Sequence, residues 1–143
     1  MPPERLPLEL SHGLRAGSVF YFEARELSSK EPHFFAVLNR DPLGEELLLL
    51  TVFTSQIDKV KIRNRERPDT VVEFGPSEYS PLTRQTAIDC NVVLRRSLGE
   101  MADLVRQKTA KYHPDLSPEM LNRIRAAVLC SPVIEDEDKE RIK

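Results

Sequence analysis

The stretch from His33 to Gln56, HFFAVLNRDPLGEELLLLTVFTSQ, decides the fold of this chain. It holds two apolar runs, Phe34–Leu38 and Leu47–Phe53, separated by an Asp-Pro pair and a glycine, which are turn signals. Neither run alternates cleanly between apolar and polar residues, so both predict strands covered on two faces, at the centre of a sheet. Antiparallel pairing around the turn would bring His33 and the Thr54-Ser55 pair to the same end of this hairpin.

Length and composition are typical of a soluble globular protein. The chain has 143 residues, of which 40% are hydrophobic and 31% charged, and it predicts a single domain over 1–143. The uninterrupted apolar runs, Phe34–Leu38 and Leu47–Leu50 among them, are far shorter than a membrane span, and the N-terminus lacks the apolar segment of a secretory signal. Cys90 and Cys130 have no paired spacing, which favours reduced thiols. We therefore expect a cytoplasmic protein with no membrane partner.

The rest of the chain predicts further strands and then helices. Residues 1–16 are expected to form a loosely ordered lead-in with one helical turn at most. Further strands are predicted at 17–22, 59–63, 70–74 and 86–94. The segment 59–63 reads as a half-exposed edge strand, because charged and apolar residues alternate in it. This order predicts an α+β fold, mainly β: a small antiparallel barrel of five to seven strands over 17–94, followed by a mostly helical part over 97–143.

Two of the expected helices are marked by their first residues. Ser97 and Glu100 have the spacing of a capping box. Ser117 is a good N-cap and Pro118 suits the first helical position. The last residues either form a short helix starting near Glu135 or fray.

The sequence contains none of the common catalytic signatures. There is no Gly-rich phosphate loop, no paired His or Cys spacing for a metal and no Gly-x-Ser-x-Gly turn, so we expect neither a metal site nor a cofactor. What remains is a set of polar residues at strand ends. His33 suits a general acid/base, because imidazole titrates near neutrality, but a surface histidine beside a proline is the alternative.

Three further features carry two interpretations each. Thr54-Ser55-Gln56 would hydrogen-bond a phosphate or simply form the turn that ends a strand. The run Lys59–Arg67, five basic residues against one acidic, would follow a nucleic-acid backbone or face solvent. Asp89 lies within an apolar strand: if buried it needs hydrogen-bond donors or a cation, and otherwise it points to solvent by the period of two.

Together these residues resemble the MazF/PemK family of small ribonucleases, the toxin halves of bacterial toxin–antitoxin pairs. The likeness spans about 17–129 and departs at one place, since His33 stands where the family has an arginine. It rests on short motifs: the strand Gly17–Phe22, the strand His33–Asn39, the strand-ending Thr54-Ser55-Gln56, Asp89-Cys90-Asn91, Gly99, and Leu116–Glu119 at a helix start.

The resemblance implies an SH3-like barrel, usually a homodimer, that cleaves single-stranded RNA without a metal ion. It implies His33 as acid/base, Thr54 and Ser55 as donors to the phosphate, and Asp89 as an orienting or base residue. The residues implied to contact the RNA backbone are Gln56, Lys59, Lys61 and Arg63. A small antitoxin protein is the implied partner. Two alternatives remain: a catalytically inactive barrel that binds nucleic acid or a partner protein, and a structural dimer that docks a regulatory peptide.

Overall fold

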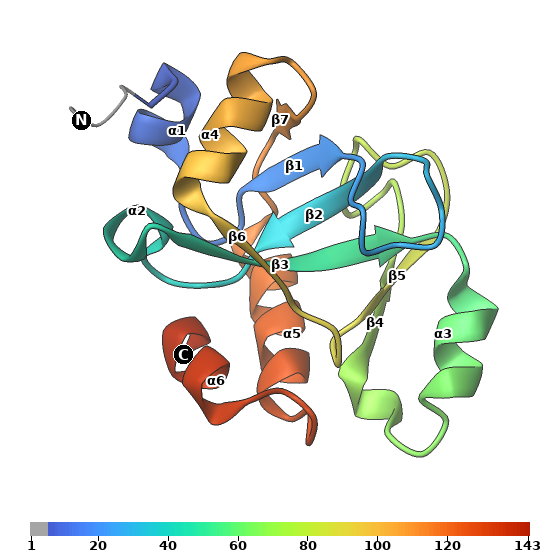
Figure 1. Ribbon diagram of the computed structural model, residues 1–143. Helices are drawn as coiled ribbons and strands as arrows, with labels where there is room; N and C mark the ends of the chain where they lie inside the picture. The colour runs from blue at the N-terminus through green and yellow to red at the C-terminus, as the bar shows by residue number, and fades with distance from the viewer. Residues whose placement is uncertain (1–5) are drawn as a thin grey trace.

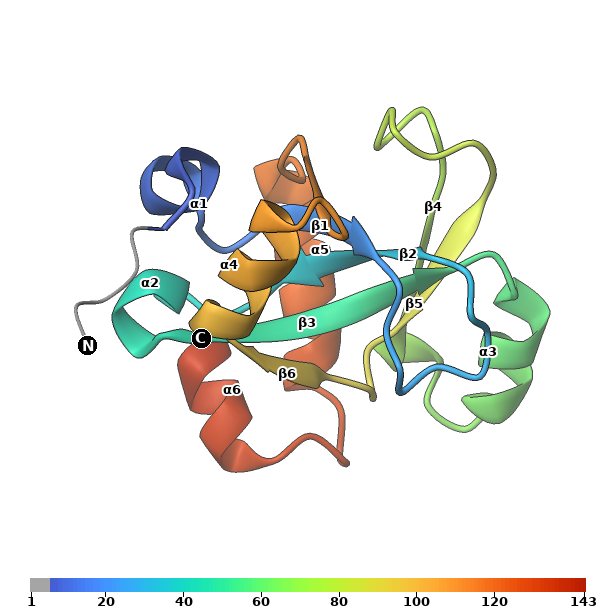
Figure 2. The same cartoon turned by 45° about the horizontal axis from the view of Figure 1, so that its top comes forward.

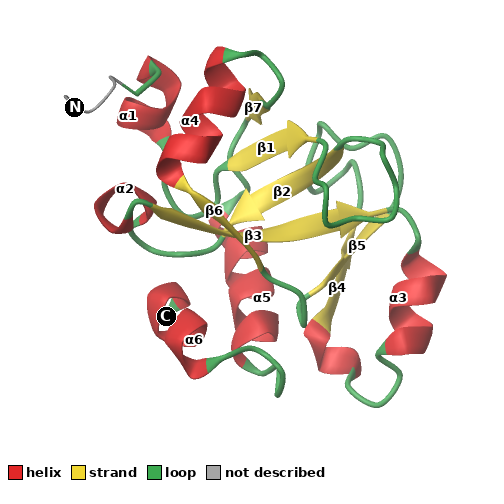
Figure 3. Ribbon diagram, in the orientation of Figure 1, coloured by secondary structure: helices red, strands yellow, loops and turns green. Residues whose placement is uncertain are grey.

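The computed structural model describes residues 6–143 and confirms the α+β class, with a seven-stranded antiparallel sheet in that part of the chain (Figure 1, Figure 3). The strands are β1 (Val19–Phe22), β2 (His33–Val37), β3 (Leu47–Thr54), β4 (Val71–Phe74), β5 (Thr86–Asp89), β6 (Leu94–Ser97) and β7 (Lys111–His113). The helices are α1 (Leu8–Gly13), α2 (Pro42–Glu45), α3 (Ile57–Arg63), the 3-10 turn η1 (Pro68–Thr70), α4 (Leu98–Arg106), α5 (Pro118–Leu129) and α6 (Asp136–Ile142).

The sheet has the order β4-β5-β3-β2-β1-β7, and β6 also pairs with β3. β3 is thus the central strand: its first half pairs with β6 and its last two residues with β5. The edge strands β4 and β7 do not pair with each other within the described residues, so closure into an SH3-like barrel stays a prediction.

β2 and β3 form the antiparallel hairpin that the sequence predicts, with Phe35 opposite Val52. The connection is α2, a single helical turn. Its N-cap is Asp41, whose carboxylate accepts a hydrogen bond from the backbone N–H of Gly44 at 3.0 Å. The Asp-Pro pair and the glycine therefore act as a helix cap, which reverses the chain between the two strands.

Both faces of the hairpin are covered, because alternate side chains enter two separate cores. On one face Ala36, Leu49 and Phe53 pack in the core under α5 and α6. On the other face Phe35 and Leu48 join the side chains of α1 and α4. Figures 1 and 2 show these two pairs of helices on opposite sides of the sheet. The two-sided burial explains why the apolar runs of β2 and β3 do not alternate.

The predicted helix starts are confirmed by their caps. The Ser97 hydroxyl accepts from the N–H of Glu100 at 3.1 Å, and the Ser117 hydroxyl accepts from the N–H of Met120 at 3.2 Å. α6 begins directly after Glu135, so the last residues form the short helix rather than fraying.

The predicted edge strand over 59–63 is wrong, because these residues belong to α3. Val60 and Asn64, four residues apart, are buried against the sheet, whereas Ile62 is 66% exposed. The segment therefore follows the helical period, and its alternation of charged and apolar residues does not mark a strand because the apolar Ile62 faces solvent.

The predicted strand over 86–94 is two strands, β5 and β6. The N–H of Asn91 donates to the Asp89 carboxylate at 3.1 Å, a turn that ends β5 and lets β6 pair with the other end of β3. β7 was not predicted, since three residues carry no periodic signal.

The predicted loose lead-in differs from what residues 6–16 show, because α1 is anchored there by the fully buried Leu10. Residues 1–5 of that lead-in lie outside the described part of the chain. None of the described helices is long and apolar enough to cross a membrane.

Asn39 fixes the start of β3 and provides a test of the hairpin. Its buried amide accepts from the N–H of Leu49 at 3.0 Å and donates to the carbonyl of Leu47 at 2.6 Å. Asn39→Ala leaves the N–H of Leu49 and the carbonyl of Leu47 without the side-chain amide that pairs them. We therefore expect the free energy of unfolding, measured in urea, to fall by about 2–4 kcal/mol. Asn122→Ala, on the exposed side of α5, is the matched control and should change it by about 0.5 kcal/mol or less. Equal effects of the two changes would contradict the assigned role of Asn39.

Candidate active site

All predicted site residues except Lys61 line one pocket of about 250 Å³, which lies where β2 begins and β3 ends. One wall is α3, and another is the loop between β1 and β2, which contributes Leu27 and Glu31. The predicted residues in this pocket, called here the first pocket, are His33, Thr54, Ser55, Gln56, Lys59, Arg63 and Asp89.

The hairpin register and the period of α3 bring these side chains together. The antiparallel pairing of β2 and β3, with Phe35 opposite Val52, brings His33 at the start of β2 and Thr54 at the end of β3 to the same end of the hairpin. Lys59 and Arg63 are four residues apart on α3 and so face the same side, toward the pocket. Lys61 faces away and forms an ion pair with Glu73 at 2.9 Å, so the structure does not bring it to the pocket.

His33 is held in one orientation by its own loop. Its ring Nδ1 lies 2.9 Å from the carbonyl oxygen of Glu31. A carbonyl oxygen only accepts hydrogen bonds, so this contact requires the proton on Nδ1 and leaves Nε2 of the neutral ring as the acceptor. The partly exposed imidazole is therefore arranged to take a proton from a ligand.

The two hydroxyls beside His33 differ in their surroundings. The Thr54 hydroxyl oxygen accepts from the N–H of Gln56 at 3.1 Å, which is a local turn contact. This bond uses only the oxygen, so the hydroxyl proton stays available to a ligand. Ser55 is exposed, and its hydroxyl has no hydrogen-bond partner among residues 6–143. The turn interpretation and the phosphate-donor interpretation are therefore compatible.

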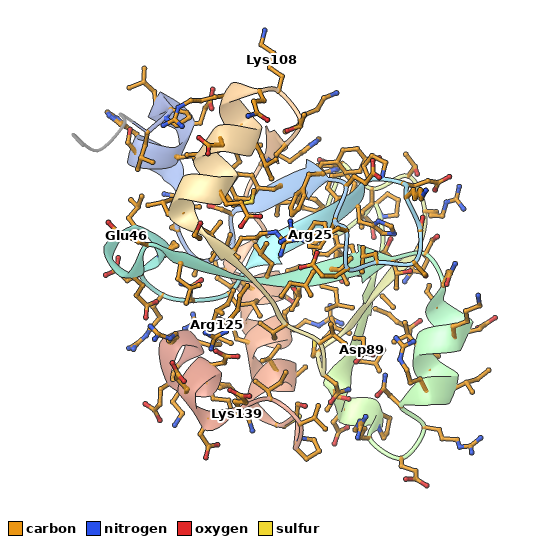
Figure 4. All side chains as sticks on the ribbon, viewed as in Figure 1. Arg25, Glu46, Asp89, Lys108, Arg125 and Lys139 are labelled. Carbon is orange, nitrogen blue, oxygen red and sulfur yellow. The ribbon has the colours of Figure 1, made fainter. Side chains whose placement is uncertain are left out.

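Asp89 is 5% exposed, so the alternative that it points to solvent is wrong. One carboxylate oxygen accepts from the side chain and backbone of Asn91 at 2.9 and 3.1 Å, and the other accepts from Nε and Nη2 of Arg63 at 3.1 and 2.9 Å. Burial raises the pKa of Asp89, but hydrogen bonds from Asn91, Asn64 and Arg63 outweigh it and hold the pKa below its usual value. Figure 4 shows Asp89 between the sheet and α3.

A polar network behind Asp89 was missed by the sequence reasoning. The Asn91 amide donates to Asn64 at 3.0 Å and to the Thr70 hydroxyl at 2.7 Å, and it accepts from the Ser131 hydroxyl at 2.6 Å. These residues lie far apart in the sequence and have no spacing that links them. The network joins α3, η1, the end of β5 and the end of α5, so it fixes the wall that carries Arg63.

The loop between β1 and β2, which forms one wall of the first pocket, is anchored by the buried guanidinium of Arg96. Arg96 is 5% exposed and forms an ion pair with Glu26 in the loop. It forms a second ion pair with Glu100, in which Nε of Arg96 lies 3.4 Å from the carboxylate. The hydrogen bond from Arg96 lowers the pKa of Glu26. Because a buried guanidinium without a partner is costly, this ion pair ties the loop to β6. Nothing in the sequence relates Glu26 to Arg96.

Neither cysteine lines the first pocket. Both cysteines are free, and burial raises the pKa of the Cys90 thiol, which disfavours the thiolate form that a nucleophile requires. Within the described residues, no three His, Cys, Asp or Glu side chains gather as metal ligands. The first pocket therefore offers an imidazole, hydroxyls and cations, a set suited to an anionic ligand that exchanges a proton.

No protein-family model matches this sequence, and no curated protein matches it. Among solved structures 26 chains match. One is an endoribonuclease in complex with its cognate antitoxin from Mycobacterial species, with 14% sequence identity and a TM-score of 0.52. The match covers 82% of this chain and 90% of that chain. At this identity the likeness shows a shared fold.

The lowered pKa of Asp89 predicts how stability depends on pH. A carboxyl group whose pKa is depressed by folding stabilises the folded state above its usual pKa of 3.8, and this contribution is lost as the pH falls. Asp89→Asn should therefore lower the free energy of unfolding most at neutral pH, and the difference from the native protein should narrow below about pH 4. Urea denaturation at neutral pH and below about pH 4 measures this difference in the free energy of unfolding. Asp103→Asn, on the surface of α4, is the control and should change the free energy of unfolding little at either pH. If the loss of stability in Asp89→Asn does not change with pH, the lowered pKa of Asp89 is contradicted.

Proposed function

We propose that this protein is a MazF/PemK-like endoribonuclease that cleaves single-stranded RNA without a metal ion, as the toxin of a toxin–antitoxin pair. The proposal rests on the gathering of an imidazole, two hydroxyls and a fixed guanidinium in the first pocket. The likeness in fold to an endoribonuclease solved with its antitoxin supports it.

The proposed reaction is attack of an RNA 2′-hydroxyl on the adjacent phosphorus. The bond from the 2′-oxygen to phosphorus forms as the bond from phosphorus to the 5′-oxygen breaks, which gives a 2′,3′-cyclic phosphate and a 5′-hydroxyl. Nε2 of His33 accepts the proton of the attacking hydroxyl, because Nδ1 is engaged by the Glu31 carbonyl. Water supplies the proton to the leaving 5′-oxygen.

Charge that develops on the phosphoryl oxygens is met by donors that are already in place. The Thr54 and Ser55 hydroxyls lie beside His33 in the first pocket. Arg63 provides the guanidinium that the family carries at the position of His33. Asp89 binds Nε and Nη2 of Arg63, and Nη1 keeps no partner in the described part of the chain. Asp89 then orients Arg63 and does not act as the base, because donors already occupy both of its oxygens.

The remaining predicted residues act on the RNA backbone. Gln56 and Lys59 line the first pocket and would contact the phosphates on either side of the scissile one. Lys61, paired with Glu73, contributes only to the attraction of the RNA from outside the pocket.

A small antitoxin is the proposed protein partner, because the structural neighbour was solved in complex with its cognate antitoxin. The homodimer is proposed from the family resemblance. A catalytically inactive protein of the same fold that binds nucleic acid or a partner protein is the alternative, and the following experiment separates the two.

Cleavage of a fluorogenic single-stranded RNA in EDTA tests the proposed function. We expect the native protein to cleave, and His33→Ala to reduce the rate by about 10²–10⁴-fold, because the acid/base group is lost. His12→Ala, on the exposed end of α1, is the matched control and should keep the native rate. If the native protein cleaves no RNA, catalysis is excluded, and RNA binding that weakens with salt would then indicate the inactive binding protein.

Arg63 and Arg65 offer a second test. Arg63→Ala should lower kcat by about 10²-fold, because a donor to the developing charge is removed. Arg65 is exposed, two residues further along and outside the first pocket, so Arg65→Ala should leave kcat near the native value. Equal losses in the two variants would show that Arg63 contributes only general positive charge.

A further inference from the structure

We infer that a second pocket, on the other face of the same strand ends, binds a nucleobase of the RNA next to the scissile phosphate. The inference rests on the proposed function and extends it to the specificity of the site. The second pocket measures about 300 Å³ and shares Glu31, His33, Thr54 and Ser55 with the first.

The two pockets lie on opposite faces of the sheet. Side chains alternate between faces along a strand, and Val52 lines the first pocket whereas Phe53 lines the second. Val52 packs with the core of α1 and α4, and Phe53 belongs to the core of α5. The strand ends that carry His33 and Thr54 therefore form a ridge between the two pockets. A phosphate bound on this ridge has its two adjoining nucleotides next to different pockets.

The second pocket has the lining that an unpaired base requires. Tyr21 and Phe34 are partly exposed, and their ring centroids lie 4.7 Å apart, so they form an aromatic wall. The segment 81–84 forms another part of the lining and ends in Arg84. Arg84 is exposed, and its guanidinium makes no hydrogen bond or ion pair with any described residue; only its backbone carbonyl has a partner, the Thr86 hydroxyl at 3.2 Å. Aromatic rings and guanidinium planes are the groups on which single-stranded bases stack.

The polar residues of the second pocket favour a base over a purely apolar ligand. Thr83 and Arg84 supply hydrogen-bond donors at its rim, and Ser55 supplies one on the ridge. An apolar ligand would cover these groups without pairing them, which is unfavourable. A base combines a flat apolar face with a polar edge and so matches both parts of the lining. The volume lies at the lower end of that of small-ligand sites, which suits a single ring system.

The tyrosines of the chain provide a direct signal for such binding. The sequence has no tryptophan and three tyrosines. Tyr21 lines the second pocket, whereas Tyr79 is 4% exposed and Tyr112 is stacked on Phe20 with a centroid distance of 5.1 Å. A base stacked on Tyr21 is therefore expected to quench part of the tyrosine fluorescence.

The test uses a single-stranded RNA oligonucleotide that is 2′-O-methylated throughout, so that no hydroxyl can attack and only binding is measured. Tyr21→Leu and Arg84→Ala should each weaken binding, measured by fluorescence anisotropy, by about 5- to 150-fold, because each removes a stacking surface. Arg84→Ala changes an exposed loop residue, so its result does not depend on an altered core. Tyr21→Phe keeps the ring and should keep the affinity while the quenching disappears.

Lys139→Ala is the control for lost positive charge. Lys139 lies on α6 and lines neither pocket (Figure 4). Because it is distant from the ridge and screened by salt, its removal should change the affinity by about twofold at most. A loss as large as that of Arg84→Ala would overturn the inference, since general charge would then explain the binding.

The outcomes separate this inference from the proposed function. Native affinity in both Tyr21→Leu and Arg84→Ala, quenching that persists in Tyr21→Phe, or no binding by the native protein each overturns the base site. If RNA cleavage depends on His33 while the two variants bind normally, the ribonuclease assignment stands and the base site falls. If the variants weaken binding and the native protein cleaves no RNA, the base site stands and catalysis falls.

Discussion

The register of β3 against β2 is the constraint on which the rest of the structure depends. β3 is paired with three strands and packed on both faces, so its side chains enter two different cores. A slip of one residue would turn Phe53 and Leu49 toward α4 and would turn Leu48 toward α5, which exchanges the contents of both cores. The same slip would separate His33 from Thr54. The packing that stabilises the sheet therefore also sets the geometry of the ridge between the two pockets.

The parts of the fold that were predicted from the sequence are those determined by neighbouring residues. The hairpin follows from two apolar runs and a turn signal, and the helix starts at Ser97 and Ser117 follow from residues three positions apart. Segments 59–63 and 86–94 were misread because tertiary contacts decide them. Ile62 alternates with basic residues as in a strand but is exposed on a helix. β5 ends because the Asp89 carboxylate accepts a hydrogen bond from the backbone N–H of Asn91, which forms a turn.

The candidate site shows the same division. The hairpin alone predicts that His33 and the hydroxyls of Thr54 and Ser55 share one end of the sheet. The attachment of Arg63 to Asp89 joins residues from different elements, and the ion pair between Arg96 and Glu26 spans 70 residues of sequence, so neither is marked by a local pattern. In the proposed reaction Asp89 is a positioning residue, and the guanidinium proposed to face the phosphate, that of Arg63, comes from α3, the segment for which the sequence predicts a strand.

The two-sided burial of β3 also bears on how the chain is made. A ribosome delivers β2 and β3 early, but β3 acquires its last partner strand only with residues 94–97, and one of its faces stays uncovered until α5, residues 118–129, has emerged. The nascent chain therefore exposes an apolar face of β3 while the residues between β3 and α5 are made, which is the situation in which chaperones bind. The core that holds β2 and β3 in register is therefore complete only after α5 has been made.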